Sequence, residues 1–392
     1  MRIGLVLPWT KSNRYSLAAL VGAVETHPEL SDVKVLIAKG DLRDTMQRAN
    51  GKFDKFVIGF SFMTPSLPHV MRDIEGLKRC TGSNRDKLIL VAGGAHPTGD
   101  PFGCLRLGFD VVMLGEGEST LTQMLLKIKK DKPIGSLKGI AFVNKGRMTR
   151  TPKPDPIVLN EYPPFALRHR LLAPIEISRG CPFVCYFCET PRIHGFRMRH
   201  RSVSEICKYL RFAARMGKRN TWFISPNAFA YGSPDGRGTY ARKVLQLLKA
   251  LRKIPKLEGI FFGTFPSEVR PEFVTNELVS AVAEYCNNKT LTVGGQSGSQ
   301  RLLDYVHRDH TVEDVQNAVQ IIREHGLVPH VDIIFGLPTE NAEDRCKTRQ
   351  LTKFITDNGG KIHCHIFMPL PGTPLETAPA GKIDPEDRKL SL

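Results

Sequence analysis

Blocks of apolar and polar residues alternate along the chain with the periods of strands and helices. In the first third, short continuous apolar runs such as 1–9 and 55–62 predict strands buried on both faces, since parallel strands covered by helices show no polar alternation. We expect strands at 1–9, 33–38, 55–62, 87–94 and 109–115, and helices at 16–26, 41–49, 66–79, 101–107 and 118–130. This order predicts an α/β fold with a doubly wound, Rossmann-like parallel sheet.

The same alternation returns in the second half of the chain. From residue 174 we expect strands up to 178 and at 220–225, 259–264, 290–295, 328–335 and 361–368, with helices at 202–216, 239–252, 272–285, 312–325 and 343–358. This order predicts a βα barrel, whose active site lies at the carboxyl ends of its strands. We expect domains at 1–140 and 171–375, with a hairpin and proline-rich linker at 141–170 and a tail at 376–392.

Composition and charge narrow the class of protein. Of the 392 residues, 41% are hydrophobic and 24% are charged, which is typical of a globular chain with two domains. The sequence has no apolar run long enough to cross a bilayer and no signal-peptide pattern, so we expect a cytoplasmic protein without a membrane partner. The net charge of +17 predicts attraction to nucleic acid or to an acidic protein, unless it is only a solvated basic surface.

Three of the nine cysteines stand close together, and the other six are scattered as expected for free thiols in a reducing compartment. Cys181, Cys185 and Cys188 form a CxxxCxxC loop after a predicted strand. Three thiolates at this spacing can hold three corners of a 4Fe-4S cluster and leave the fourth iron open to a small ligand. A tetrahedral zinc site completed by His194 is the alternative, although structural zinc more often uses separated CxxC pairs.

The CxxxCxxC loop, with Phe187 before its last cysteine, resembles the signature of the radical S-adenosylmethionine (SAM) superfamily. The resemblance implies a partial (β/α)6 barrel, SAM chelated by the open iron, and cleavage of SAM to a 5′-deoxyadenosyl radical. Phe187 is implied to face adenine, and Gln296, Ser297 and Ser299 to hold the ribose and methionine. The full set of candidate SAM-binding residues is Phe187, Ser225, Asn227, Gln296, Ser297 and Ser299. Alternatively, the serines only terminate strands.

Short polar loops, most of them with glycine, follow several predicted strands of the first domain. Carboxyl ends of parallel strands meet at one edge of the sheet, so these loops predict a site for a nucleotide-like ligand. The pattern over residues 1–140 resembles the cobalamin-binding domain that often precedes a radical SAM domain. The candidate cobalamin-binding residues are Pro8, Trp9, Ser61, Thr64, Gly93, Gly94, His96, Gly115, Glu116 and Gly117.

The first domain departs from that family in one respect. Its sequence has no Asp-x-His-x-x-Gly motif, the usual source of the lower axial histidine of cobalt. We therefore expect cobalamin to bind without an axial histidine from this motif, an arrangement that would favour the cob(I)alamin state needed to accept a methyl group. His96 also has an alternative interpretation as a loop histidine with local hydrogen bonds.

The whole pattern resembles the cobalamin-dependent radical SAM methyltransferases, and among them the archaeal glutamine C-methyltransferases that modify methyl-coenzyme M reductase in methanogens. The resemblance implies three cofactors: a 4Fe-4S cluster, SAM, and cobalamin as methylcobalamin. It implies methyl transfer to an unactivated carbon, the Cα of a glutamine, after the 5′-deoxyadenosyl radical removes its hydrogen. The implied partners are a protein or peptide substrate and an electron donor such as a ferredoxin or flavodoxin, rather than nucleic acid.

Two other interpretations remain open. A tRNA methylthiotransferase would fit the Gln-Ser-Gly-Ser segment and the basic charge, but it would need a second cysteine triad in the first half, where only Cys80 and Cys104 occur. A non-catalytic regulatory protein that binds an iron-sulfur cluster and cobalamin would not cleave SAM. Near the end of the chain, His363 and His365 are expected on one side of the last strand, with Cys364 opposite, so we interpret them as structural or substrate-lining.

Overall fold

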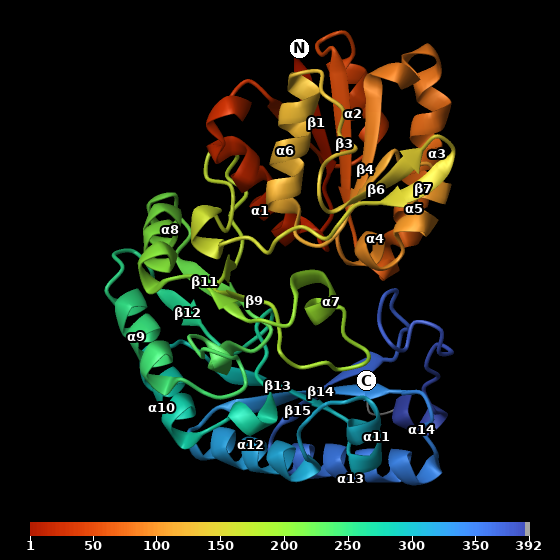
Figure 1. Ribbon diagram of the computed structural model, residues 1–392. Helices are drawn as coiled ribbons and strands as arrows, with labels where there is room; N and C mark the ends of the chain where they lie inside the picture. The colour runs from red at the N-terminus through yellow and green to blue at the C-terminus, as the bar shows by residue number, and fades with distance from the viewer. Residues whose placement is uncertain (389–392) are drawn as a thin grey trace. The chain divides into compact units, whose positions relative to one another are not determined.

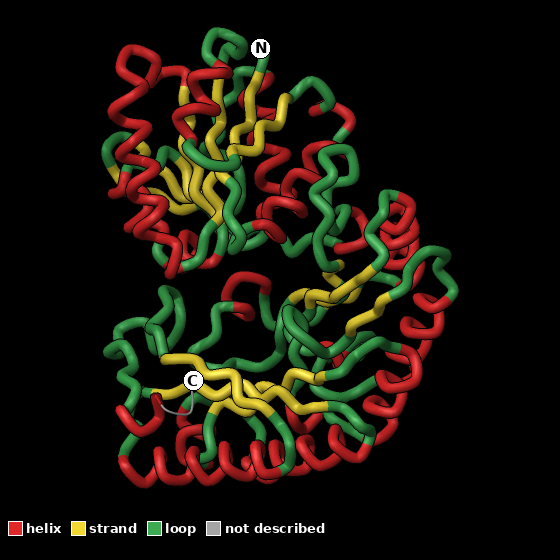
Figure 2. Tube along the Cα trace, turned by 180° about the vertical axis from the view of Figure 1, so that it is seen from behind, coloured by secondary structure: helices red, strands yellow, loops and turns green. Residues whose placement is uncertain are grey.

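The computed structural model describes residues 1–388, apart from the side chains of residues 80–84 and 387. The chain forms two compact units, the first spanning Met1–Ala173 and the second beginning at Pro174 (Figures 1 and 2). In this described part, no helix is both long enough and apolar enough to span a bilayer.

A seven-stranded sheet forms the centre of the first unit, with its strands in the order β2-β1-β3-β4-β5-β6-β7 (Figure 1). The strands β1 to β5 are parallel to one another. Their bounds are β1 Ile3–Pro8, β2 Lys34–Ala38, β3 Lys55–Ser61, β4 Leu88–Gly93 and β5 Val111–Met113. The order reverses between β1 and β3, so this is the predicted doubly wound topology, with its ligand-binding edge at the carboxyl ends of these strands.

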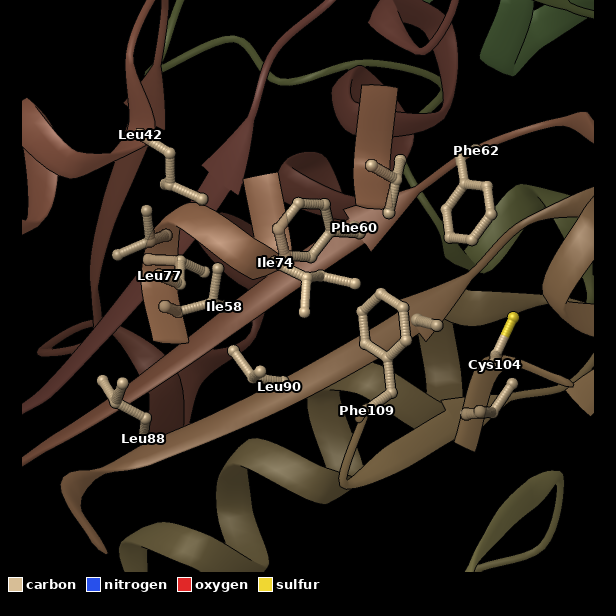
Figure 3. Close-up of a cluster of buried hydrophobic side chains, with 14 of the residues drawn as sticks. Leu42, Ile58, Phe60, Phe62, Ile74, Leu77, Leu88, Leu90, Cys104 and Phe109 are labelled. Atoms are coloured by element: carbon tan, nitrogen blue, oxygen red, sulfur yellow. The ribbon is translucent and has the colours of Figure 1, made fainter. Parts of the chain in front are cut away.

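Helices cover both faces of this sheet. They are α1 Arg14–Thr26, α2 Leu42–Ala49, α3 Leu67–Thr81, α4 Ala95–Gly99, α5 Pro101–Leu107 and α6 Gly117–Lys129. Val57 belongs to a core cluster with residues of α1 and α6, whereas Ile58 and Phe60 pack with residues of α2, α3 and α5 (Figure 3). Neighbouring strand residues point to opposite faces, and both faces are buried, which explains the continuous apolar runs.

The hairpin after β5 is part of the same sheet. Its strands, β6 Ile140–Asn144 and β7 Arg147–Arg150, continue the sheet as antiparallel neighbours of β5 and of each other. The sequence predicts this hairpin as part of the linker at 141–170. The structure makes it the edge of the sheet because Ile140 and Ala141 are fully buried in the two cores of the first unit.

Residues 151–173 also pack on the first unit. The carboxylate of Glu25 on α1 accepts hydrogen bonds from the backbone N–H groups of Arg168 (3.1 Å) and His169 (3.2 Å). The carboxylate of Glu116 accepts one from the N–H of Ile157 (2.8 Å). These side-chain acceptors, together with the proline-restricted backbone, fix the position of the stretch on this unit.

Six parallel strands form a partial barrel in the second unit. In spatial order they are β8 Ile175–Glu176, β11 Asn220–Ile224, β12 Gly259–Phe261, β13 Thr290–Gln296, β14 Val328–Phe335 and β15 Lys361–Ile366. An isolated parallel bridge joins Val269, in the segment that follows β12, to Val293 of β13. The helices between these strands form the outer layer (Figure 2) and are α8 Val203–Arg215, α9 Ala241–Arg252, α10 Asn276–Tyr285, α12 Val312–Glu324 and α13 Ala342–Asp357. This is the expected (β/α)6 barrel.

Several short elements were not predicted from the periodicity. In the second unit they are β9 Ser178–Arg179, β10 Arg199–His200, α7 Thr190–His194, α11 Gln300–Tyr305 and α14 Pro385–Arg388. Each has six residues or fewer, which is too short for a helical or strand period to emerge from the sequence.

Candidate functional site

The cysteine loop begins directly after β9 and is held by backbone hydrogen bonds. The N–H of Cys181 donates to the carbonyl of Gly195 (3.1 Å), and the N–H of Tyr186 donates to the carbonyl of Val306 (3.0 Å). Gly180 has a φ of +87°, and a Cβ there would collide with the carbonyl oxygen of Arg197. Only glycine fits this turn, which carries the chain from β9 into the cysteine loop.

The three cysteine side chains line one pocket, as the ligands of one cluster must. In a cubane each cysteine binds a different iron, whereas one zinc ion would hold all three thiolates itself at about 2.3 Å. Burial raises the pKa of Cys188 to about 11, so iron binding must displace its proton.

A pocket of about 350 Å³ opens beside this loop, a volume typical of small-molecule sites. The three cysteines line it with Phe187, Ser225 and Gln296 of the candidate SAM-binding set. Glu176 and Arg179 also line it and form an ion pair at 2.6 Å. The candidate SAM-binding residues that are not part of this lining are Asn227, Ser297 and Ser299, and their contact with SAM stays a prediction.

Two arginines that the sequence analysis did not single out bring positive charge to the cysteine loop. Nη1 of Arg308 lies 3.6 Å from Sγ of Cys185, and Nη1 of Arg270 lies 3.9 Å from it. Arg270 is 3% exposed and its guanidinium lies over the ring of Phe183. Cationic donors at this position favour a thiolate and a more negative, reduced cluster. The arginines follow Cys185 by 85 and 123 residues, so no local spacing could reveal them.

We expect Arg308→Gln to lower the reduction potential of the cluster. Removing a positive charge beside a cluster ligand makes an added electron less favourable, by an amount on the order of 100 mV for one charge at an effective dielectric constant of about 20. A redox titration followed by electron paramagnetic resonance measures the shift. Arg215→Gln, at an exposed position on α8, is the matched control. An unchanged potential in Arg308→Gln would contradict this electrostatic role.

The Gly-Gly-Gln-Ser-Gly-Ser segment at the end of β13 sends its side chains in two directions. Gln296, with a φ of +67°, lines the pocket. Oγ of Ser297 lies 3.3 Å from Oγ1 of Thr348, and the hydroxyl of Ser299 donates to Oδ1 of Asp344 at 2.6 Å. Both partners lie on α13, so the two serines attach the end of β13 to this helix.

Asp344 is the centre of this attachment. Its side chain forms a capping box with Asn341 at the start of α13 and pairs with Arg301. Burial by itself would raise its pKa, but hydrogen bonds from Arg301 and Ser299 outweigh burial and hold the pKa at about 2, below the usual 3.8. A depressed pKa means that the fold stabilises the carboxylate, by about 2 kcal/mol. This stabilisation is present above the unfolded pKa and is lost as the pH falls through about 2.

We expect Asp344→Asn to lower the free energy of unfolding by about 2 kcal/mol at pH 7, with a smaller loss at pH 3, where the aspartate already contributes less. Urea unfolding at the two pH values measures both effects. Asp357→Asn, an exposed position at the other end of α13, should change little at either pH. Equal losses at pH 7 and pH 3 would show that the carboxylate charge is not what stabilises the segment.

The candidate cobalamin-binding residues lie at or just beyond the carboxyl ends of β1, β3, β4 and β5. Pro8 ends β1, Ser61 ends β3 and Gly93 ends β4. Gly94 has a φ of +101°, and a Cβ there would lie 2.8 Å from the carbonyl oxygen of Phe62, so glycine is required. The remaining members follow these strand ends and are Trp9, Thr64, His96, Gly115, Glu116 and Gly117.

His96 makes local contacts. Its Nδ1 lies 3.1 Å from Oγ1 of Thr64, its ring stacks on Phe62 with centroids 5.5 Å apart, and the residue is 6% exposed. Burial lowers its pKa, which favours the neutral ring. Cobalamin binding at this sheet edge without a histidine from the usual motif stays a prediction.

Two family models match the chain. The radical SAM superfamily matches residues 175–352, and the B12 binding domain matches residues 14–125. The radical SAM methyltransferase TsrM from Kitasatospora setae has a TM-score of 0.74 at 15% identity, covering 95% of this chain and 74% of TsrM. The cobalamin-dependent SAM radical enzyme OxsB has a TM-score of 0.76 at 15% identity, covering 96% of this chain and 60% of OxsB. At these identities the likeness shows a shared fold.

The chain thus combines a B12-binding domain with a radical SAM domain, in the fold of the cobalamin-dependent radical SAM methyltransferases. It is an enzyme of the radical SAM class, and its cofactors are a 4Fe-4S cluster, SAM and cobalamin.

Sequence relatives match either most of the chain or about half of it. An uncharacterized protein of Methanopyrus kandleri is 25% identical over 387 residues, covering 86% of this chain and 70% of that protein. A probable threonylcarbamoyladenosine tRNA methylthiotransferase of Archaeoglobus fulgidus is 33% identical over 192 residues, covering 48% of this chain. The chain spans only 43% of that tRNA-modifying relative.

Proposed function

We propose that this chain is a C-methyltransferase that methylates an unactivated carbon, the Cα of a glutamine in the catalytic subunit of methyl-coenzyme M reductase. The observation that supports the reaction is a cysteine triad beside a small-molecule pocket in the same chain as a B12-binding domain. When bound, the cluster and SAM would supply the radical that removes a hydrogen atom from the substrate, and cobalamin would supply the methyl group.

The residues of the pocket orient SAM and place positive charge beside the cysteine loop. The Glu176–Arg179 pair is bidentate, at 2.9 Å and 2.6 Å, so both side chains have a fixed orientation at the pocket wall. Arg270 and Arg308 provide positive charge at the cysteine that they contact. Because these side chains are held in place before SAM binds, few of them need to be ordered when it enters the pocket.

The net charge supports a protein substrate. With 56 basic and 39 acidic residues, the chain can attract a large acidic partner and orient it before docking. We further propose a ferredoxin or flavodoxin as the electron donor and a cytoplasmic location. The free cysteines, which include Cys207 and Cys286, are compatible with a reducing compartment.

The decisive experiment is anaerobic reconstitution with iron, sulfide and hydroxocobalamin, followed by desalting and visible and electron paramagnetic resonance spectra. We expect about one cobalamin and one cluster per chain. Reduction with SAM and a glutamine-containing peptide should then yield 5′-deoxyadenosine and a peptide heavier by one methylene, which mass spectrometry locates. A cluster without retained cobalamin would overturn the proposed methylation reaction. A cofactor-loaded enzyme that leaves glutamine unmodified would overturn the proposed substrate.

A tRNA methylthiotransferase is the second candidate, because the Archaeoglobus fulgidus relative is the more identical of the two sequences compared above. Its likeness covers about half of the chain, whereas the chain carries a B12-binding match at 14–125 as well as the radical SAM match at 175–352. Incubating the reconstituted enzyme with tRNA and searching the nucleosides for a methylthio group tests this activity. No release of 5′-deoxyadenosine with any substrate would favour a regulatory protein.

A further inference from the structure

Three side chains able to bind metal converge on the last two barrel strands. Asp332 lies on β14, and His363 and His365 lie two residues apart on β15, so both rings project from one face of that strand. The backbone register pairs Asp332 with His363. One potential ligand atom of each side chain lies within 4.8 Å of those of the other two.

The face that carries these residues is opposite to the outer helices. Val331 and Ile333, the neighbours of Asp332, are fully buried, and a Cβ added at Gly295 would touch both Val331 and Val315 of α12. Strand residues alternate, so Asp332 points into the barrel. The backbone register pairs Asp332 with Gly294 of β13, two residues before Gln296, which lines the pocket of the cysteine loop. The three side chains therefore lie near that pocket.

The distances match those between neighbouring ligands of one metal ion. Nδ1 of His363 lies 2.8 Å, and Nε2 of His365 lies 3.5 Å, from the same oxygen, Oδ1 of Asp332. Ligand atoms at about 2.1 Å from a metal ion stand about 3.0 Å apart in octahedral geometry and about 3.4 Å apart in tetrahedral geometry. Two imidazole nitrogens and one carboxylate oxygen suit zinc or iron(II) and leave coordination positions open.

A hydrogen bond between Asp332 and His363 explains the position of only one of the two histidines. The second ring, His365, lies at the outer limit of hydrogen bonding to Asp332, with the two ring centroids 4.4 Å apart. Asp332 is only 3% exposed, whereas the side chains of His363 and His365 are 60% and 45% exposed. A buried carboxylate with two imidazole nitrogens beside it is an environment that a divalent cation stabilises.

We propose that Asp332, His363 and His365 form a binding site for a divalent transition-metal ion, zinc or iron(II), distinct from the iron-sulfur cluster. The open coordination positions of this site face the barrel interior and accept water or an oxygen atom of a bound molecule. The site does not depend on which substrate the enzyme methylates.

Zinc binding to the cluster-loaded enzyme tests this site. The cluster is reconstituted first, zinc chloride is added and removed by desalting, and zinc and iron are measured by mass spectrometry. We expect about one zinc per chain, with affinity lowered more than about 100-fold in His363→Ala and His365→Ala while the iron content stays constant. His363→Gln, which is closer in volume, separates loss of the ligand from a packing change.

His325→Ala is the matched control, since this half-buried histidine directly follows α12 and its ring bonds to Asn276 instead of Asp332. It should keep the full zinc content. X-ray absorption at the zinc edge should show nitrogen and oxygen neighbours and no sulfur. Sulfur neighbours would assign the zinc to cysteines and overturn the site, as would zinc binding that is weak or is unaffected by the His363 and His365 variants.

Discussion

Cys185→Ala abolishes the release of 5′-deoxyadenosine from SAM. Each cysteine of the triad holds a different iron, so the loss of one removes a corner of the cluster and with it the iron that must stay open for SAM. The substitution also removes the sulfur that Arg270 and Arg308 contact, leaving two guanidinium groups without that partner. We expect iron to fall from about four per chain to nearly none and cleavage to fall to the level without protein.

Iron analysis and chromatography of the products after reduction with dithionite measure this loss. Cys346→Ala is the control, because Cys346 is an exposed free thiol on α13 outside the pocket lining. Circular dichroism should be unchanged in both variants. If Cys185→Ala still cleaved SAM at the original rate, the CxxxCxxC loop could not hold the reacting cluster.

Gly298→Ala destabilises the barrel and weakens SAM binding. A Cβ at Gly298 would lie 2.7 Å from Cα of Thr348 and closer still to the carbonyl oxygen of Lys347. Both are backbone atoms of α13, so a side-chain rotation cannot relieve the overlap. The helix or the end of β13 must move, at a cost of about 3 kcal/mol. Gln296 stands two residues earlier and lines the pocket, so we expect the movement to disturb SAM contacts as well.

Denaturant unfolding of the second unit and equilibrium dialysis of SAM measure these two effects. Gly238→Ala is the matched control, since a Cβ at Gly238 meets no atom within 4 Å and its backbone lies outside the left-handed region. It should change stability by less than about 1 kcal/mol. A Gly298→Ala variant as stable as Gly238→Ala would mean that the strand end and α13 do not pack as closely as the structure has them.

Local sequence was sufficient to predict most helices and strands. The strand 328–335 and the helix 101–107 have the predicted limits, and the helix predicted at 343–358 begins and ends one residue earlier. Each of these segments has one dominant pattern, which nearby residues create by themselves. The hairpin differed because its position depends on pairing with β5, a partner about thirty residues earlier in the chain.

The candidate site divides in the same way. The cysteine triad is a local motif, because its ligands lie within eight consecutive residues. Gln296 lines the pocket, whereas Ser297 and Ser299, close neighbours in the same segment, bond to α13. Sequence could nominate all three residues, but it could not tell which side chain faces the pocket, because the turn after β13 sets their directions.

The sequence by itself determined two α/β units, a CxxxCxxC loop, and the placement of polar loops at strand ends, because periodicity and spacing depend on nearby residues. The tertiary structure decided which distant side chains meet. It brought Arg270 and Arg308 to Cys185, and it brought Asp332 of β14 to two histidines of β15. Contacts of this kind arise from strand order and register, which bring together residues that share no local pattern.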